Sequence, residues 1–370
     1  VHFQMLTAVT DCSRAFLHAT NPRKLLLYIS NKNMDEFRRY GLDVPRNSNL
    51  LLALKAIYGA QDAGDHFYGL LMDILINVLD FIPNEDDPCL LVKTEDSETV
   101  ILLVHVDDIP MASTSKTLLS KVVMTIFEHL DLGLADSPIT TLLGASFTYY
   151  RNSAGIFSVG RSNISKIVDL ATQLGLTDRN IVHNVLPSKH AVTMDTPENA
   201  AKIAELEANM PYQSTIGKLN HLTNLRPDVL VIISKLGGKR CAPSEHDYFL
   251  LEWVVIYLYT HRFEQRINTK SPLEYPELSD ASGDAAFNSD IRGRSREGQA
   301  HHVLGQLVHF STTTTQSPVP TSTNGAEIPA LANAAKTALY IRRISSFIMS
   351  HMNKSYPSLN TPIPVYSDNA

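Results

Sequence analysis

The sequence is poor in cysteine and lacks a long apolar run, and each absence excludes a class of protein. Its three cysteines, Cys12, Cys89 and Cys241, lie far apart, which argues against a disulfide framework and against a zinc site. No stretch approaches about 18 uninterrupted apolar residues, and the first ten residues lack the charged-then-apolar build of a signal peptide. We therefore expect a globular protein of a reducing compartment, with no membrane as partner.

Excess positive charge is also absent. The 370 residues carry 32 Lys and Arg against 38 Asp and Glu, a net charge of −6, so the chain has no overall basic signature of a nucleic-acid binder. Basic residues gather locally, at residues 235–240, 292–296 and 342–343, but taken alone such runs are typical of a solvated surface. Apolar content is high, at 44% of residues, which is enough for two or three domains.

A hairpin is predicted in the first part of the chain. Residues 99–106 form a short aliphatic run bounded by polar segments, as a buried strand would, and residues 109–112 can return as a second strand. Asp107 and Asp108 then lie at the hairpin tip. A helix over residues 116–130 is expected next.

The remaining pattern predicts a mixed α/β fold with a helical middle. Helices are expected over residues 49–79 with a break at 59–64, 162–174, 198–208, 214–236 with an interruption at Pro227, 244–261 and 326–350. Strands are expected over residues 140–150 and 155–159 with a turn at 152–155, and over 277–280, 303–310 and 364–367. Two prolines bracket residues 271–276, which predicts a linker before a last domain.

Two groups of three acidic residues stand out. They are Asp11, Asp107 and Asp108 in the first part, and Asp280, Glu327 and Asp368 in the last. Phosphoryl transfer through paired magnesium ions needs carboxylate oxygens, because Mg²⁺ prefers hard oxygen ligands in octahedral geometry. Clustered carboxylates would repel one another without a cation. Each group therefore predicts a site for two magnesium ions.

Ordinary structural roles compete with this interpretation for every residue. An Asp-Asp pair after an apolar strand is more often a plain turn, and Asp11 can cap a helix over residues 13–17. Glu327 is favourable at a helix N-terminus. Phe16 is by default a core aromatic.

Ten segments, in order, carry a resemblance to a known family. They are TDCSRAFLH (10–18), LKAIYG (54–59), DDPCLLVK (86–93), VHVDDI (104–109), DLG (131–133), LLGA (142–145), MPYQSTIGKLNHLTNLRPDVLVIISKL (210–236), LSDASGD (278–284), GAEIPALANAAKTALYIRR (325–343) and VYSDN (365–369). In this order and spacing they resemble the reverse transcriptase and ribonuclease H region of the Pol polyprotein of copia-type long-terminal-repeat retrotransposons. The Arg-Pro-Asp of residues 226–228 is a distinctive part of the match.

The resemblance implies a fold, an activity and partners. It implies a polymerase palm at residues 1–150, a thumb and connection region at 151–270 and a ribonuclease H-like α/β domain at 271–370. The palm acids and the nuclease acids would each bind Mg²⁺, and Phe16 would exclude a ribose 2′-hydroxyl in the nucleotide-binding site. Implied partners are RNA template, DNA primer, RNA–DNA hybrid, dNTPs, and integrase and protease segments of the polyprotein. The implied location is the cytoplasm, within virus-like particles, with a product acting in the nucleus.

Departures from the family pattern keep a second hypothesis open. His105 stands where the family has a tyrosine, and residues 313–315 are threonines where it has lysines. In the AQDAGD run of residues 60–65 a lysine and an arginine of the family are lost, Asp62 replaces a glutamine and Asp65 adds a second carboxylate. Acid facing phosphate would weaken binding by repulsion. The second hypothesis is a decayed element that folds and binds nucleic acid but catalyses nothing. A third, an unrelated helical scaffold, requires the ordered matches to be chance.

We also expect the sequence to be a fragment. The family's chain runs well upstream of its first palm aspartate, so the fingers would be absent and the last domain would end early. A palm without fingers should position a dNTP poorly. We therefore expect this piece alone to polymerise little.

Overall fold

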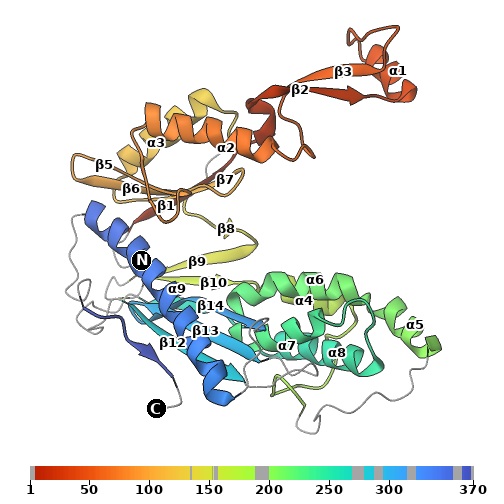
Figure 1. Cartoon of the computed structure of the whole chain (residues 1–370), viewed down its shortest axis with the longest axis vertical. Helices are drawn as coiled ribbons and strands as arrows, with labels where there is room; N and C mark the ends of the chain where they lie inside the picture. The colour runs from red at the N-terminus through yellow and green to blue at the C-terminus, as the bar shows by residue number, and fades with distance from the viewer. Residues whose placement is uncertain are drawn as a thin grey trace. The chain divides into compact units, whose positions relative to one another are not determined.

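The computed structural model shows a mixed α/β protein (Figure 1). It describes residues 5–133, 136–151, 153, 157–187, 200–268, 279–286, 295–314, 322–352 and 361–367. The chain forms two compact units, which we name the N-terminal unit (residues 3–139 and 347–354) and the C-terminal unit (residues 140–346 and 355–370). No described helix is both long and apolar enough to cross a membrane.

A five-stranded antiparallel sheet in the order β1-β7-β6-β5-β4 carries the N-terminal unit. Its strands are β1 (Leu6–Asp11), β4 (Ile82–Pro83), β5 (Leu90–Glu95), β6 (Glu98–Leu103) and β7 (Asp108–Ser113). The helical elements packed in the same core are α2 (Ala63–Asp73), the π-helix η2 (Ile74–Val78) and α3 (Lys116–His129). Ser115 accepts a hydrogen bond from the Leu118 amide at the start of α3, which confirms the predicted helix.

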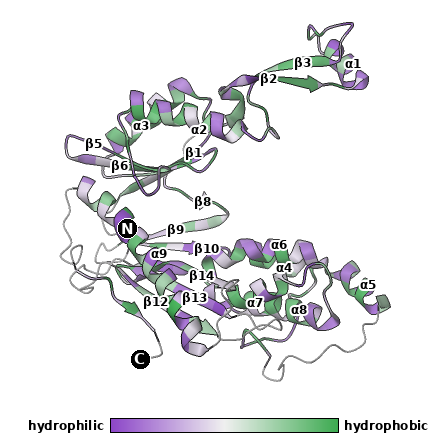
Figure 2. Ribbon diagram, in the orientation of Figure 1, coloured by the Kyte–Doolittle hydropathy of each residue, from purple (hydrophilic) through white to green (hydrophobic). Residues whose placement is uncertain are grey.

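A separate two-stranded ribbon follows β1. It consists of β2 (Thr20–Tyr28) and β3 (Leu50–Lys55), preceded by the 3-10 helix η1 (Ala15–His18) and joined by α1 (Asn31–Arg39). The apolar part of the ribbon is the stretch where residues 25–27 of β2 pair with residues 51–53 of β3 (Figure 2). The predicted helix over residues 49–79 is therefore wrong in its first part, because Leu50 to Ala53 pair with β2 across the ribbon. A continuous leucine run is compatible with a helix or with a strand, so the pairing with β2 determines that this segment is a strand.

Helices dominate the first part of the C-terminal unit, as predicted. They are α4 (Ile164–Gln173), α5 (Ala200–Asn209), α6 (Tyr212–Leu222), the 3-10 helix η3 (Thr223–Leu225), α7 (Pro227–Gly237) and α8 (Glu245–Thr260). A sheet in the order β11-β10-β9-β8 accompanies them, made of β8 (Thr141–Leu142), β9 (Ala145–Arg151), β10 (Phe157–Ser162) and β11 (Gln265–Asn268). Pro227 opens α7, where a missing amide hydrogen costs no helical bond. Residues 271–276 and most of the turn at 152–155 lie outside the described residues.

A second four-stranded sheet, in the order β14-β13-β12-β15, completes this unit. Its strands are β12 (Ser279–Ala286), β13 (Arg296–Val303), β14 (Gln306–Thr314) and β15 (Val365–Tyr366), and the long helix is α9 (Thr323–His351). The strands predicted at 277–280 and 303–310 are wrong in extent. The sequence analysis missed β13, and the expected strand at 303–310 spans the turn between β13 and β14.

Alanines and one glycine let α9 approach β12 closely. Ala326, Ala330 and Ala334 are buried on α9 at a spacing of four residues, which places them on one face of the helix. A Cβ atom added at Gly283 of β12 would lie 3.1 Å from the Cβ of Ala334. Only a residue without a side chain fits this contact without a shift of the helix.

Candidate catalytic carboxylates

Asp107 and Asp108 lie at the end of the β6–β7 hairpin, as predicted. The His105 amide donates to the Asp108 carbonyl at 2.9 Å, and the Asp108 amide donates to the His105 carbonyl at 3.0 Å. Val106, between them, has a φ of 55°, a left-handed conformation that a tight turn requires. The hairpin thus closes on itself and fixes the two aspartates at its tip.

Strand β1 brings Asp11 to the same place. It pairs antiparallel with β7, and the register puts Asp11 directly opposite Asp108. Directly opposed residues in such a pair have Cα atoms about 4.5–5.5 Å apart. The Cys12 amide donates to the Asp107 carbonyl at 2.9 Å, which ties the end of β1 to the hairpin tip. The backbone therefore brings Asp11 to two acids that lie almost 100 residues later in the sequence.

The electrostatics of this group favour a cation. Burial raises the pKa of Asp108, and the neighbouring charges of Asp107 and Asp11 raise it further, against a smaller opposing effect of His105. Burial, followed by the charges of Asp11, Asp107 and Asp131, raises the pKa of the Cys12 thiol to about 11. The Cys12 thiol therefore stays protonated at neutral pH, which disfavours the thiolate that a nucleophile or a metal ligand requires.

The donor set fits magnesium in chemical type. Carboxylate oxygens are its preferred ligands, and a divalent ion would relieve the repulsion that raises the pKa of Asp108. Among the residues that the structure describes, however, no three acidic, histidine or cysteine side chains are grouped closely enough to hold a metal ion. The backbone places the acids together, and their side chains would have to rotate to converge. The magnesium site stays a prediction.

A fourth acid lies beside the group and was not singled out from the sequence. The Ser13 amide donates to the Asp131 carbonyl at 3.0 Å, and the Arg14 guanidinium lies 3.5 Å from the Asp131 carboxylate. The Gly133 amide donates to the Asp11 carbonyl at 2.7 Å, and a Cβ atom at Gly133 would lie 3.5 Å from that oxygen. The DLG segment at 131–133 was the signal, because it stood among the family-like motifs.

Phe16 packs as a core aromatic. Its ring centroid lies 4.6 Å from that of Tyr58 and 6.4 Å from that of Phe67, and the side chain is partly buried against the core of the N-terminal unit. These contacts fix the ring, which η1 itself carries. Its predicted nucleotide-binding role remains a prediction.

The acid at position 62 is not a bare negative charge. Arg23 lies 3.1 Å from the Asp62 carboxylate, and the His66 ring lies 3.3 Å from it. Asp65 is exposed in the first turn of α2, where a negative charge is favourable. The repulsion expected from Asp62 toward phosphate is therefore reduced by its own neighbours.

The nuclease acids lie on adjacent elements but are not seen together. Ala281, Gly283 and Ala285 lie on the face of β12 that packs against α9. Because successive residues of a strand point to opposite faces, Asp280 lies on the other face. There Nδ1 of His302, its cross-strand neighbour, lies 2.9 Å from Oδ1 of Asp280. Glu327 is 6% exposed near the start of α9. Strand β15 runs parallel to β12, and Asp368 lies just beyond it, outside the described residues.

Beside this pair, His301 is buried on β13. Burial lowers its pKa to about 4, and the neighbouring His309 and His302 add to the effect. Its Nε2 lies 3.0 Å from the side-chain oxygen of Gln299. His301 is therefore neutral at physiological pH and contributes no positive charge beside Asp280.

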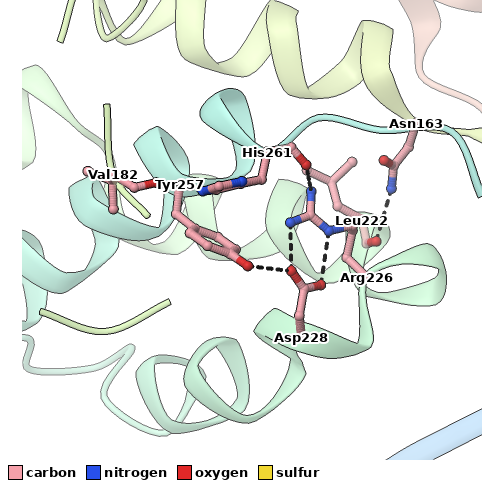
Figure 3. Close-up of polar contacts among 7 residues, drawn as sticks. All are labelled: Asn163, Val182, Leu222, Arg226, Asp228, Tyr257 and His261. Atoms are coloured by element: carbon pink, nitrogen blue, oxygen red, sulfur yellow. Dashed lines mark hydrogen bonds and ion pairs between the residues drawn. The ribbon is translucent and has the colours of Figure 1, made fainter. Parts of the chain in front are cut away.

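The Arg-Pro-Asp motif fastens the helical core (Figure 3). Arg226, 1% exposed, donates to both carboxylate oxygens of Asp228 at 2.9 and 2.7 Å and to the His261 carbonyl at 3.0 Å. The Tyr257 hydroxyl donates to Asp228 at 3.0 Å. Burial alone would raise the pKa of Asp228, but the hydrogen bonds from Arg226 and Tyr257 lower it overall. The motif joins the start of α7 to the end of α8 and has a structural role.

The chain is similar in sequence to Pol polyproteins of plant transposons. No protein-family model matches the chain. It is 22% identical over 258 residues to the retrovirus-related Pol polyprotein from transposon TNT 1-94 of Nicotiana tabacum, covering 67% of this chain and 18% of that protein. It is 23% identical over 230 residues to the retrovirus-related Pol polyprotein from transposon RE1 of Arabidopsis thaliana, covering 59% of this chain and 14% of that protein.

Solved structures give a looser likeness. The foamy viral protease-reverse transcriptase dRH in complex with double-stranded DNA is 11% identical, covering 98% of this chain and 51% of that one, with a TM-score of 0.21. A selenomethionine-labelled mutant of the prototype foamy virus protease-reverse transcriptase is 12% identical, covering 100% and 65%, with a TM-score of 0.24. These superpositions are too loose to support an argument. The sequence matches support similarity to a Pol region of retroelements, and the chain spans less than a fifth of the curated relatives that it matches.

Proposed function

We propose that this chain is the reverse transcriptase and ribonuclease H region of a copia-type retroelement, acting by two-metal phosphoryl transfer. The observation that carries the proposal is the register of β1 against β7, which sets Asp11 opposite Asp108 at a hairpin tip that also holds Asp107. A scaffold using these acids only as caps and turns would have no reason to bring the most distant of them to this tip.

In the polymerase part, Asp11, Asp107 and Asp108 would hold two magnesium ions. Bound there, magnesium neutralises the attacking and leaving oxygens of an in-line displacement. The chain's own contribution is to fix the three carboxylates on paired strands and to bury Asp108 partly, so that the group favours a cation. RNA template, DNA primer and dNTPs would be the substrates.

In the nuclease part, Asp280, Glu327 and Asp368 would hold the ions that activate a water against the RNA strand of a hybrid. The parallel pairing of β15 with β12 supports this, because it sets Val365, three residues before Asp368, opposite Ala281, the neighbour of Asp280. Integrase and protease segments of a polyprotein would be further partners, since the similar plant proteins are Pol polyproteins.

A second candidate, a catalytically inactive relative, is favoured at the nuclease by one contact. Nδ1 of the His302 ring lies within hydrogen-bond distance, 2.9 Å, of Oδ1 of Asp280. Strand alternation places the Asp280 carboxylate on the face of β12 opposite α9. Metal binding would require His302 to release Asp280.

Paired activity assays test the proposal. Cleavage of the RNA strand of a labelled hybrid, and extension of a DNA primer on RNA, are measured with Mg²⁺ for the parent chain and for Asp108→Ala, Asp280→Ala and Asp43→Ala. Asp43 is an exposed acid outside both groups and serves as the matched control. We expect Asp280→Ala to abolish cleavage and Asp108→Ala to abolish whatever extension the parent shows. Cleavage that persists in Asp280→Ala would reject the nuclease assignment, and its absence from the parent would favour the inactive relative.

A further inference from the structure

Two basic segments that lie far apart in the sequence meet on the surface of the C-terminal unit. Arg296, the first residue of β13, donates from its guanidinium to the Ser234 hydroxyl of α7 at 3.0 Å. Ser234 directly precedes the run of residues 235–240, and Figure 1 shows α7 beside β13 and β14. Lys235, Lys239 and Arg240 are exposed there. We define these three residues with Arg296 as the α7 basic surface.

The helix end does not need these cations. The Gly238 amide donates to the Ser234 and Lys235 carbonyls, and the Lys239 amide donates to the Leu236 carbonyl at 3.0 Å. The last carbonyls of α7 are therefore satisfied by the backbone itself. One lysine in the last turn is explained by the helix dipole, but two further cations beyond its end are not.

The nearby acids are engaged elsewhere. Glu245 pairs with Lys202 at 2.8 Å, and the Asp247 carboxylate accepts from both the amide and the hydroxyl of Ser244 at 2.8 Å. Glu297, next to Arg296, accepts from the side-chain amide of Asn333. Among the described residues, none of the three exposed cations of the α7 basic surface forms an ion pair with a carboxylate. In that part of the chain these cations stand without a paired acid, although the net charge of the chain is −6.

The surface is also held in shape. The Gln213 side-chain amide at the start of α6 donates to the Arg240 carbonyl at 3.3 Å, and the Ala242 amide donates to the Lys239 carbonyl at 3.1 Å. These bonds fix the backbone that carries Lys239 and Arg240, so less order is lost there when the cations meet a line of negative charges, such as a phosphate backbone.

We propose that the α7 basic surface binds the phosphate backbone of an RNA–DNA hybrid, independently of sequence and through residues that belong to neither group of catalytic acids. The choice of nucleic acid as the partner rests on the proposed function. Such contacts position a duplex without reading its bases, and they release counterions on binding. The surface would hold the substrate while the acids act on it.

Salt dependence of binding tests this surface. Anisotropy of a short fluorescein-labelled RNA–DNA hybrid is followed from about 50 to about 200 mM KCl, the range over which phosphate contacts weaken strongly. The patch variant carries Lys235→Gln, Lys239→Gln and Arg240→Gln. The control variant carries Lys32→Gln, Arg39→Gln and Lys116→Gln, three exposed cations of the N-terminal unit, and has the same net charge. Unfolding followed by far-ultraviolet circular dichroism, which reports on the helices of both units, checks that both variants are folded.

The expected difference follows from the number of contacts. Three lost contacts lower the slope of log K against log salt by about 2.7, so over this range the parent loses affinity about 40-fold more than the patch variant. The control variant should behave as the parent. Equal slopes in all three proteins, or a parent that shows no salt-dependent binding, would overturn the proposal. Binding to phosphatidylserine vesicles is measured for the same proteins. If the patch variant loses vesicle binding but keeps the parent's binding to the hybrid, the proposal is also overturned, because the partner would then be a membrane.

The same assay separates this inference from the catalytic proposal. Asp43→Ala should bind the hybrid with the parent's affinity, because this exposed acid belongs neither to the α7 basic surface nor to the catalytic groups. If the parent binds the hybrid through the α7 basic surface but neither cleaves RNA nor extends a primer, only the catalytic proposal is rejected. If the parent and the patch variant cleave the hybrid with equal efficiency at all salt concentrations, only the inference about the α7 basic surface is rejected.

Discussion

Replacing Arg226 tests how much the Arg-Pro-Asp motif stabilises the C-terminal unit. In Arg226→Met, two bonds to Asp228 and one to the His261 carbonyl are lost, as is the stacking of the guanidinium 4.8 Å from the Phe263 ring centre. Breaking a buried ion pair costs about 3–5 kcal/mol. The Asp228 side chain is 30% exposed, so water can solvate part of the charge left behind. We expect a loss at the lower end, about 3 kcal/mol, or about 6–12 °C in Tm.

The single tryptophan of the chain makes the measurement direct. Trp253 packs on the core of the helical region, and its indole donates to the Asn184 carbonyl at 2.9 Å, so its fluorescence reports on this unit. Urea unfolding is compared for the parent, Arg226→Met and Arg240→Met, an exposed arginine whose replacement should change stability by less than about 0.5 kcal/mol. If both variants lose stability equally, the motif does not fasten α7 to α8.

Acid should erase this difference. The folded pKa of Asp228 is lowered, so the stabilisation it provides is complete above its unfolded pKa and is lost as pH falls through the folded pKa. The gap between the parent and Arg226→Met should therefore shrink in acid. A gap that stays constant down to full protonation of the carboxylates would contradict the ion-pair explanation.

Three further changes have defined outcomes. Gly283→Val should cost about 1–3 kcal/mol by overpacking, because its Cβ would press on Ala334 at 3.1 Å; unchanged urea unfolding would refute the close approach of α9. Ser244→Ala removes the capping box of α8 and should cost about 1 kcal/mol, seen in the same unfolding. Iodoacetamide at pH 8 should label exposed Cys241 and leave Cys12 unmodified, and mass spectrometry showing equal labelling would contradict its burial and raised pKa.

The sequence allowed some of this fold to be predicted because local signals were strong. The aliphatic run before Asp107 predicted the hairpin, the apolar pattern of residues 116–130 predicted α3, and Pro227 marked the division between α6 and α7. Strand β3 was missed because its consecutive leucines show no alternation of polar and apolar residues, and because its partner β2 is distant in sequence. Strand β13 was missed because it holds charged residues, histidines and a glycine, and only its neighbours make it a strand.

For the candidate sites, residue type could be predicted but side-chain direction could not. The pairing of Asp11 with Asp108 depends on a register that no local pattern specifies. On β12 a shift of one residue would turn Asp280 toward α9, yet the sequence LSDASGD fits either face. The contact between His302 and Asp280 depends on the pairing of β12 with β13, and β13 itself was not foreseen.

Calorimetric unfolding with and without Mg²⁺ tests most directly whether Asp11, Asp107 and Asp108 form a cation site. In an Asp280→Ala background, to silence the nuclease acids, metal at about 100 times its Kd should stabilise the chain by about 2.7 kcal/mol. Asp108→Asn should abolish this gain. Because the folded pKa of Asp108 is raised, its ionisation lowers stability above that pKa, so Asp108→Asn should also be more stable than the parent without metal at pH 7. An equal magnesium-induced gain in both proteins would contradict the cation site.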